Sequence, residues 1–153
     1  GPEDSSGSAL SVSGDLRVSG RMRDNSLRSQ VAAGNQIATT TNGWLDVPNM
    51  SVSINLPATA QVLITFHMPG VQITGTTNGA GNYRIVVDGT QYAFTRNEWN
   101  NNGWELRSVY LNRLLSLGAG SHTITAQWWC ANGGTLTGCW YSDTRTLTVI
   151  EYS

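Results

Sequence analysis

Charged side chains are scarce in this chain. They make up 12% of its 153 residues, lysine is absent, and the formal net charge at pH 7 is −1. Such a chain has no overall electrostatic field that would draw it to nucleic acid or to an anionic membrane. We therefore expect no nucleic-acid partner. A local group of arginines near the N-terminus fits a solvated face better than a phosphate site, and it consists of Arg17, Arg21, Arg23 and Arg28.

Long apolar runs and catalytic motifs are also missing. No stretch reaches the roughly 20 apolar residues of a membrane span, so we expect no membrane insertion. The GxSxG, HExxH, P-loop, EF-hand and GxGxxG patterns are absent. Neither His67 nor His122 has a nucleophile and an acid at a spacing that suggests a catalytic relay. We expect no enzyme, no metal site and no cofactor, although a carboxylate pair brought together by the fold stays open as an alternative.

The cysteines are few. Cys130 and Cys139 flank the run ANGGTLTG, whose glycines and threonines favour a hairpin. A disulfide between the two arms is then geometrically reasonable, and it would indicate an oxidising compartment. We predict this disulfide, with residues 131–138 forming a rigid exposed finger; two unrelated buried thiols are the alternative. A zinc site is not expected, because no CxxC pair exists and both histidines are distant in sequence.

The N-terminal segment carries a short repeat. Gly1-Pro2 resembles the scar of a protease cleavage, which would make the chain a piece of a longer protein. SVSGDL (11–16) is followed by RVSGRM (17–22), and apolar residues alternate through both units. One apolar strand face is too narrow to bury itself, so we predict a neck in which several chains intertwine; an edge strand is the alternative. The neck residues are Leu10, Val12, Leu16, Val18 and Met22.

From about residue 35, short strand patterns alternate with turns. Residues 24–35 suggest a polar connector, and residues 78–82 suggest a flexible run. Asp88-Gly89 is a strong hairpin signal. Residues 104–117 match strand and helix spacing, and we expect a strand because the segment lies between hairpin arms. The other expected strands are Met50–Leu56, Val62–Met68, Val71–Thr77, Tyr83–Val87, Tyr92–Phe94, Ile124–Cys130 and Arg145–Tyr152.

Six tryptophans are a high count, and two of them bracket a polar run. Asn97 to Trp104 is too rich in asparagine and glycine for a core, so at least one of its two indoles should lie near solvent. Indoles pack on sugar C–H groups, while amides and guanidinium groups bond hydroxyls. The predicted glycan site consists of Trp99 and Trp104 with Arg96, Asn97, Asn100, Asn101 and Asn102. In the alternative, both indoles fold back as a lid on the end of the barrel.

A second aromatic group surrounds the cysteines. Trp128 shares its strand face with Ile124 and should be core, whereas Trp129 points the opposite way. Trp129, Trp140 and Tyr141 are therefore further candidates for ligand binding. For Trp129, packing against a neighbouring subunit is the alternative.

Three segments carry a resemblance to a known family. YRIVVDGTQYAF (83–94), LGAGSHTITAQW (117–128) and RTLTVIEY (145–152) resemble the C1q/TNF-like jelly-roll domains that end trimeric fibres of phage tails and bacterial surfaces. The tips of adhesive trimers made by predatory bacteria are similar in layout. The resemblance implies an all-β jelly-roll sandwich, homotrimeric, with the head at 35–153 after a scar and neck at 1–34. The calcium sites of C1q-type heads have no counterpart here.

The resemblance also implies a function. A head of this type would be an extracellular fibre tip, on a cell or virion surface or exported to the periplasm. It would bind a cell-surface glycan or another envelope component, with itself as the other partner in a homotrimer. The alternative is a structural trimerisation cap or virion decoration domain that has no specific ligand.

Overall fold

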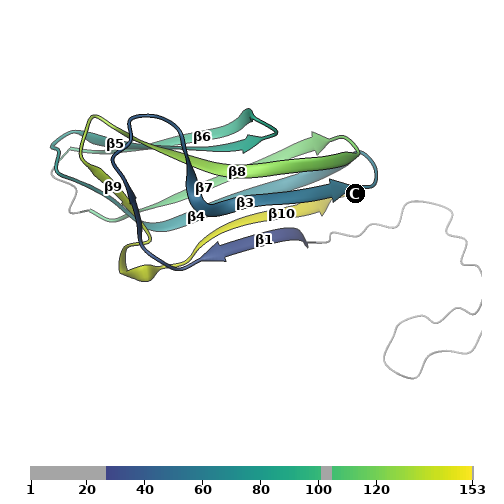
Figure 1. The fold of residues 1–153 in the computed structure, drawn as a ribbon, viewed down its shortest axis with the longest axis horizontal. Helices are drawn as coiled ribbons and strands as arrows, with labels where there is room; N and C mark the ends of the chain where they lie inside the picture. The colour runs from purple at the N-terminus through teal and green to yellow at the C-terminus, as the bar shows by residue number, and fades with distance from the viewer. Residues whose placement is uncertain (1–26, 101–104, 153) are drawn as a thin grey trace, which may run out of the picture.

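Two antiparallel β-sheets form a sandwich in the computed structural model, which describes residues 27–100 and 105–152 (Figure 1). The strands are β1 Leu27–Ala33, β2 Ile37–Thr39, β3 Leu45–Leu56, β4 Ala60–Thr74, β5 Gly79–Val87, β6 Thr90–Trp99, β7 Arg107–Leu117, β8 Gly120–Ala131, β9 Thr135–Gly138 and β10 Arg145–Tyr152, with a 3-10 helix, η1, at Trp140–Ser142. No helix in the described part is long and apolar enough to cross a membrane.

The strand order is that of a jelly roll. One sheet runs β1-β10-β4-β7, with β9 and β2 added beyond the bulge of β4, and the other runs β3-β8-β5-β6. From β3 to β8, only β5 and β6 are consecutive and paired, while each other connection crosses between the sheets. Crossing connections of this kind define the jelly roll. The predicted all-β jelly-roll sandwich is confirmed.

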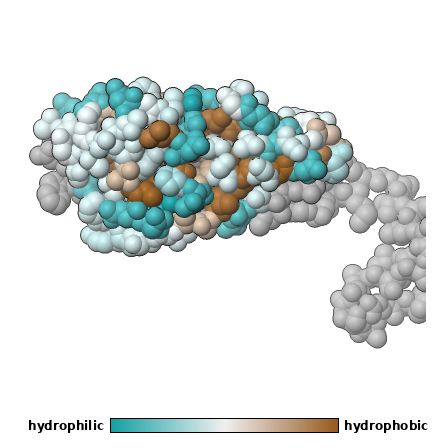
Figure 2. Space-filling model, viewed as in Figure 1, coloured by the Kyte–Doolittle hydropathy of each residue, from teal (hydrophilic) through white to brown (hydrophobic). Residues whose placement is uncertain are grey.

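The core lies between the sheets because apolar residues alternate along the strands. Val62, Ile64 and Phe66 of β4 face Ile124 and Trp128 of β8, and all five are at most 1% exposed. A period of two places one side of each strand in the core. The alternation predicted for these strands is confirmed. On the side drawn in Figure 2, exposed apolar residues form separate patches in a largely polar surface.

The long strand β4 differs from the sequence prediction. We expected Pro69-Gly70 to end one strand and Val71 to start another. The structure has a single strand with a register shift between Met68 and Val71. Gly70 has a φ of 60°, which glycine adopts at little cost, and the Pro69 carbonyl accepts a bond from the Cys139 amide. The two residues therefore form a bulge, after which β4 pairs with β9.

Other local expectations have mixed outcomes. The hairpin at Asp88-Gly89 is confirmed, and the segment before Leu117 is strand β7. The connector predicted for 24–35 is wrong over β1, which pairs with β10 as an edge of the head. The flexible run predicted for 78–82 is wrong from Gly79 onward, because β5 begins there between β6 and β8. The predicted neck residues, Leu10, Val12, Leu16, Val18 and Met22, lie outside the described residues.

The predicted disulfide is wrong. Cys130 and Cys139 are both buried free thiols. Their segments do not form the two arms of one hairpin, since β9 pairs with β2 and β4 rather than with β8. The Cys130 thiol points to the carbonyl of Gly133 at 3.6 Å, and burial raises its pKa. The predicted exposed finger is wrong as well, because Leu136 in β9 is completely buried.

One arginine is completely buried in the sandwich. The guanidinium of Arg145 donates to the carbonyls of Pro48 at 2.9 Å, Asn35 at 2.7 Å and Ala33 at 3.4 Å. The Pro48 carbonyl is in β3, the Ala33 carbonyl is at the end of β1, and the Asn35 carbonyl is in the connection from β1 to β2. A buried charge is tolerated only when it is hydrogen-bonded, and here it ties β10 to β1, to β3 and to the β1–β2 connection.

The molecule has two distinct ends. Figure 1 shows the start of β1 and the end of β10 at one end of the sandwich. The β4–β5 and β8–β9 connections, the end of β6 and the start of β7 lie at the opposite end, which we call the distal end. The distal end is thus the end away from both the start of β1 and the end of β10.

Candidate functional site

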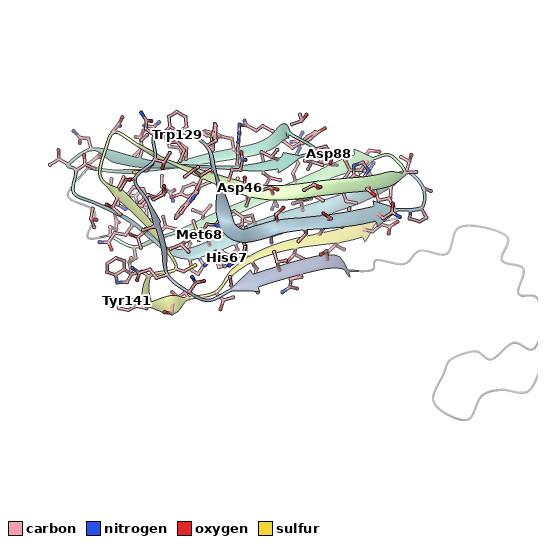
Figure 3. The ribbon with its side chains drawn as sticks, in the orientation of Figure 1. Asp46, His67, Met68, Asp88, Trp129 and Tyr141 are labelled. Carbon is pink, nitrogen blue, oxygen red and sulfur yellow. The ribbon has the colours of Figure 1, made fainter. Side chains whose placement is uncertain are left out.

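Three aromatic rings meet on the outer face of the β3-β8-β5-β6 sheet. The Trp44 ring lies 5.6 Å from Trp129 and 6.1 Å from Phe94, edge to face in both pairs. Phe94 is 49% exposed, and the two indoles are half-buried. Figure 3 shows Trp129 on the side of the molecule formed by β5, β6 and β8. We call Trp44, Phe94 and Trp129 the aromatic cluster.

Strand register brings polar groups beside these rings. Phe94 on β6 pairs with Arg84 on β5, which pairs with Gln127 on β8, and Gln127 pairs with Asp46 on β3. The Arg84 Nε donates to Gln127 Oε1 at 2.8 Å, and Gln127 Nε2 donates to Asp46 Oδ1 at 2.7 Å. Residues in cross-strand register point to the same side of a sheet. One row of hydrogen bonds therefore crosses the sheet next to the aromatic cluster.

The rings themselves are held in place. The Arg84 guanidinium lies 4.2 Å from the centre of the Trp44 ring, a cation–π contact. Burial lowers the pKa of Arg84, but from a value so high that the group stays cationic. The Trp129 Nε1 donates to Asn42 Oδ1 at 2.7 Å. A ligand that binds rings already fixed in this way loses little conformational entropy of the protein.

A polar hollow lies near the distal end of the sandwich. It measures about 170 Å³ and is lined by Asn78, Gly79, Arg96, Glu98, Asn100 and Asn132. The Arg96 Nε and Glu98 Oε1 form an ion pair at 2.8 Å, and Asn132 Nδ2 donates to the Asn78 carbonyl at 3.2 Å. We call this hollow the distal pocket. Amide, carboxylate and guanidinium groups converge in it, and such groups both donate hydrogen bonds to hydroxyls and accept them.

The chemistry of this face suits binding of a ligand with apolar and polar parts. Its rings can stack on C–H groups, and its amides can bond hydroxyls. Within residues 27–100 and 105–152, no group of three His, Cys, Asp or Glu side chains could hold a metal ion.

The predicted glycan site is divided by the fold. Arg96 and Asn100 both line the distal pocket. Trp99 is 2% exposed, its Nε1 donates to the Glu105 carbonyl at 2.9 Å, and the Arg107 guanidinium lies 5.2 Å from its ring centre. Of the two alternatives for Trp99, the structure favours the lid, so this indole is not open to a ligand.

The remaining candidates lie apart from the aromatic cluster, except Trp129. Asn97 is half-buried beside Trp99, and its Nδ2 has no hydrogen-bond partner within the described residues. Tyr141 is 80% exposed, and its ring contacts Trp140 at 6.3 Å. Figure 3 shows Tyr141 on the side of the molecule away from Trp129. The other candidates lie outside the described residues, and they are Asn101, Asn102 and Trp104.

Of the aromatic cluster and the polar groups bonded beside it, the sequence predicted only Trp129 as a ligand-binding residue. The turn at Asp88-Gly89 alone would pair Arg84 with Ala93, and only the register shift between Ile85 and Val86 brings Arg84 opposite Phe94. Trp44 lies between β2 and β3 and gave no periodic signal. Its place beside Trp129 depends on the pairing of β3 with β8, far apart in the sequence.

No protein-family model matches this chain, and neither does any curated protein. Among solved structures, it is similar to Eiger TNF from S. frugiperda, with TM-score 0.42, 10% identity, and coverage of 78% of this chain and 90% of that one. A carbohydrate-binding module of Cellvibrio mixtus lichenase 5A, solved with cellotriose, has TM-score 0.36, 17% identity, and coverage of 84% and 98%. A family 35 carbohydrate-binding module from an environmental isolate has TM-score 0.38, 17% identity, and coverage of 79% and 95%.

Proposed function

We propose that this protein is the extracellular tip of a trimeric fibre and that it binds a cell-surface glycan without turning it over. The observation that carries the proposal is the aromatic cluster, with Arg84 and Gln127 bonded beside it. A sugar ring has an apolar C–H face and a rim of hydroxyls. The cluster offers rings for the face, and the neighbouring amides and guanidinium offer partners for the rim.

The trimer draws support from the opposite sheet. The residues of β4, β7 and β10 that alternate on the outer side include no Asp, Glu or Arg within the described chain, and they are Gln61, Leu63, Thr65, His67, Ser108, Tyr110, Asn112, Leu114, Ser116, Thr146, Thr148, Ile150 and Tyr152. Arg113 of β7 is exposed as well, but it pairs with Ile64 and so has the register of the inner side. Tyr110 is 60% exposed and Leu114 is 55% exposed. An apolar hollow of about 300 Å³ is lined by Gln61, Leu63, Leu114 and Tyr152. Interface cores are depleted in charge and rich in aromatics, so we assign this face to contacts between copies of the chain.

A two-part experiment tests the proposal. Light scattering of the whole chain should give about three times its mass of 16.5 kDa. The trimer should then bind members of a glycan array. A monomer would overturn the fibre assignment, and a trimer that binds no glycan would leave the structural cap as the function.

A pair of variants locates the binding. Phe94→Ala should weaken glycan binding by at least about tenfold, because an exposed ring in a recognition surface contributes about 2 kcal/mol or more. The melting temperature should change little, since the Phe94 side chain is half exposed. Tyr110→Ala removes an exposed ring from the opposite sheet and serves as the control, with glycan affinity per chain unchanged. Equal affinities for Phe94→Ala and the unaltered chain would place the site elsewhere.

A further inference from the structure

The aromatic cluster and the distal pocket lie along one strand face. Phe94, Arg96 and Glu98 alternate on β6 and are all exposed, so they point to the same side of the sheet. Phe94 belongs to the cluster, while Arg96 and Glu98 line the pocket. Four residues of strand separate Phe94 from Glu98, which is about 13 Å at the usual rise per residue. The two parts thus form one surface that is longer than a single sugar ring.

An unpartnered donor lies between the two parts. Asn82 pairs in register with Arg96 on one side and with Trp129 on the other. It is on the outer side of β5, because the neighbouring Tyr83 is in the core. Asn82 is 3% exposed, and its Nδ2 has no hydrogen-bond partner in the described part of the chain. A buried amide left unpaired is costly, and a movement of the surrounding side chains that lets a ligand hydroxyl reach Asn82 would remove the cost.

The size of the distal pocket indicates that it holds part of a ligand. Its volume of about 170 Å³ is below the roughly 300–1,000 Å³ of pockets that enclose a whole small molecule. Two of the residues that line it, Arg96 and Glu98, are exposed on the outer side of β6. One unit of a chain molecule can therefore enter the pocket while the next unit lies toward the aromatic cluster.

The charges that border this surface are already compensated. Arg96 is paired with Glu98, while Arg84 bonds Gln127, which in turn donates to Asp46. The two guanidinium groups and two carboxylates sum to zero. To bind one of these guanidinium groups, an acidic sugar would have to displace its present partner. A carboxylate of the protein would then lose its hydrogen-bond partner. An uncharged ligand requires no such exchange.

We propose, on the basis of the function proposed above, that the ligand is an uncharged oligosaccharide of at least two units that spans the aromatic cluster and the distal pocket. One sugar stacks on the cluster, and the next places hydroxyls among Asn132, Glu98 and Arg96. The Nδ2 of Asn82 donates to the ligand between them once the side chains that cover it move aside.

Titration calorimetry with defined oligosaccharides tests the proposal. The probes are cello-, chito- and malto-oligosaccharides from monosaccharide to tetrasaccharide, with oligogalacturonates and sialyllactose as acidic probes. A neutral series should bind the trimer, and its disaccharide or longer members should bind at least about tenfold more tightly than the monosaccharide. Equal affinity across that series, or preference for an acidic probe, would overturn the inference while leaving glycan binding intact. Failure of every probe would count against the proposed function and this inference together.

Variants of the distal pocket provide a second readout. Asn132→Gly removes the amide and keeps a backbone with φ of 66°, and it should abolish the advantage of the longer probe without changing monosaccharide affinity. Glu98→Gln frees Arg96 and should increase binding of the acidic probes. Asn55→Gly, at an exposed position on β3 of the same sheet, is the matched control and should leave every affinity unchanged. An unaltered preference for the longer probe in Asn132→Gly would show that the pocket takes no part.

Discussion

The two outer faces of the sandwich differ in their charged side chains. The β3-β8-β5-β6 face carries Arg84, Asp46, Arg96 and Glu98, each bonded to a neighbour. The outward side of β4, β7 and β10 carries no Asp, Glu or Arg among its described residues. A face of bonded polar groups around rings can take a hydrated ligand, whereas an uncharged face loses little when another protein covers it. The proposed function rests on this contrast, with recognition proposed for one sheet and assembly for the other.

The uncharged face is uncharged because its strand β10 turns its charges inward. Arg145 and Glu151 lie on the same side of β10, and both are buried. The residues that alternate with them are threonine, isoleucine and tyrosine. The period of a strand therefore gives β10 one charged inner side and one uncharged outer side.

The largest effect is expected when Arg145 is replaced, and it is an effect on the free energy of unfolding. Replacing it with leucine removes the guanidinium that donates to the Pro48, Asn35 and Ala33 carbonyls. We expect a loss of about 3–5 kcal/mol in the free energy of unfolding, because buried acceptors lose their partner. Urea denaturation measures the loss, with Arg113→Leu on the exposed part of β7 as the control. A change below about 1 kcal/mol would show that the buried charge is not a structural tie.

Next in size is a charge placed on the uncharged face. Leu114→Glu puts a carboxylate beside the apolar hollow, and we expect the trimer to dissociate because an unpaired charge buried in an interface is costly. Sedimentation should then report a folded monomer. Ser53→Glu adds the same charge to an exposed position of the other sheet and should remain trimeric. If both variants stay trimeric, the copies meet through some other surface.

A smaller effect is expected at the recognition face. Arg84→Lys keeps the charge but loses the planar stack on Trp44 and the Nε bond to Gln127. We expect glycan binding to weaken by about three- to tenfold, since a cation–π contact and one hydrogen bond each contribute about 1 kcal/mol. Calorimetry with the best neutral probe measures the change, and Arg113→Lys is the matched control. Unchanged affinity would mean that glycan binding does not depend on the contacts of Arg84 with Trp44 and Gln127.

The smallest effect concerns pH and the end of the sandwich opposite the distal pocket. His122 Nδ1 lies 2.7 Å from Asp88 Oδ2, and its Nε2 lies 2.9 Å from the Gly118 carbonyl. The hydrogen bond to Asp88 raises the pKa of His122, and the same bond lowers the pKa of Asp88. The contribution of His122 is present below about pH 6.5 and is lost as the pH rises through its raised pKa. That of Asp88 is present above about pH 4 and is lost as the pH falls through its lowered pKa.

The pair should therefore stabilise the fold most between about pH 4 and pH 6.5. Because the Asp88 side chain is 49% exposed, solvent screening limits the contribution to about 1 kcal/mol or less. The difference in unfolding free energy between the natural chain and His122→Gln should be larger near pH 5.5 than near pH 8.5. Equal differences at both values, or a larger one at the higher pH, would contradict the assignment.

Local patterns predicted the strands well and their partners poorly. Alternation in Val62–Met68 and the turn at Asp88-Gly89 were sufficient, because strand period and hairpin turns act over a few residues. Cys130 and Cys139 were misjudged for the opposite reason. Their spacing is compatible with a hairpin, but β9 pairs with β2 and β4. No pattern within the segment itself predicts this pairing.

The candidate site shows the same limit. Trp99 and Trp129 have equally suggestive neighbours in the sequence, yet one is buried under Glu105 and Arg107 while the other joins an outer-face cluster. Trp44 had no signal at all. The sequence indicates that an aromatic side chain will pack against other residues. Which residues it packs against depends on the position of its strand in the sheet.

The sequence by itself determined the all-β class, the alternation of buried and outward residues, and the shortage of charge that separates the two faces, because these depend on residue type and on a period of two. Only the tertiary structure decided that Trp44, Arg84 and Gln127 meet, that the thiols stay apart, and that Arg145 is enclosed by carbonyls. Those contacts join strands distant in sequence, and their register is set by the packing of the whole core rather than by any one segment.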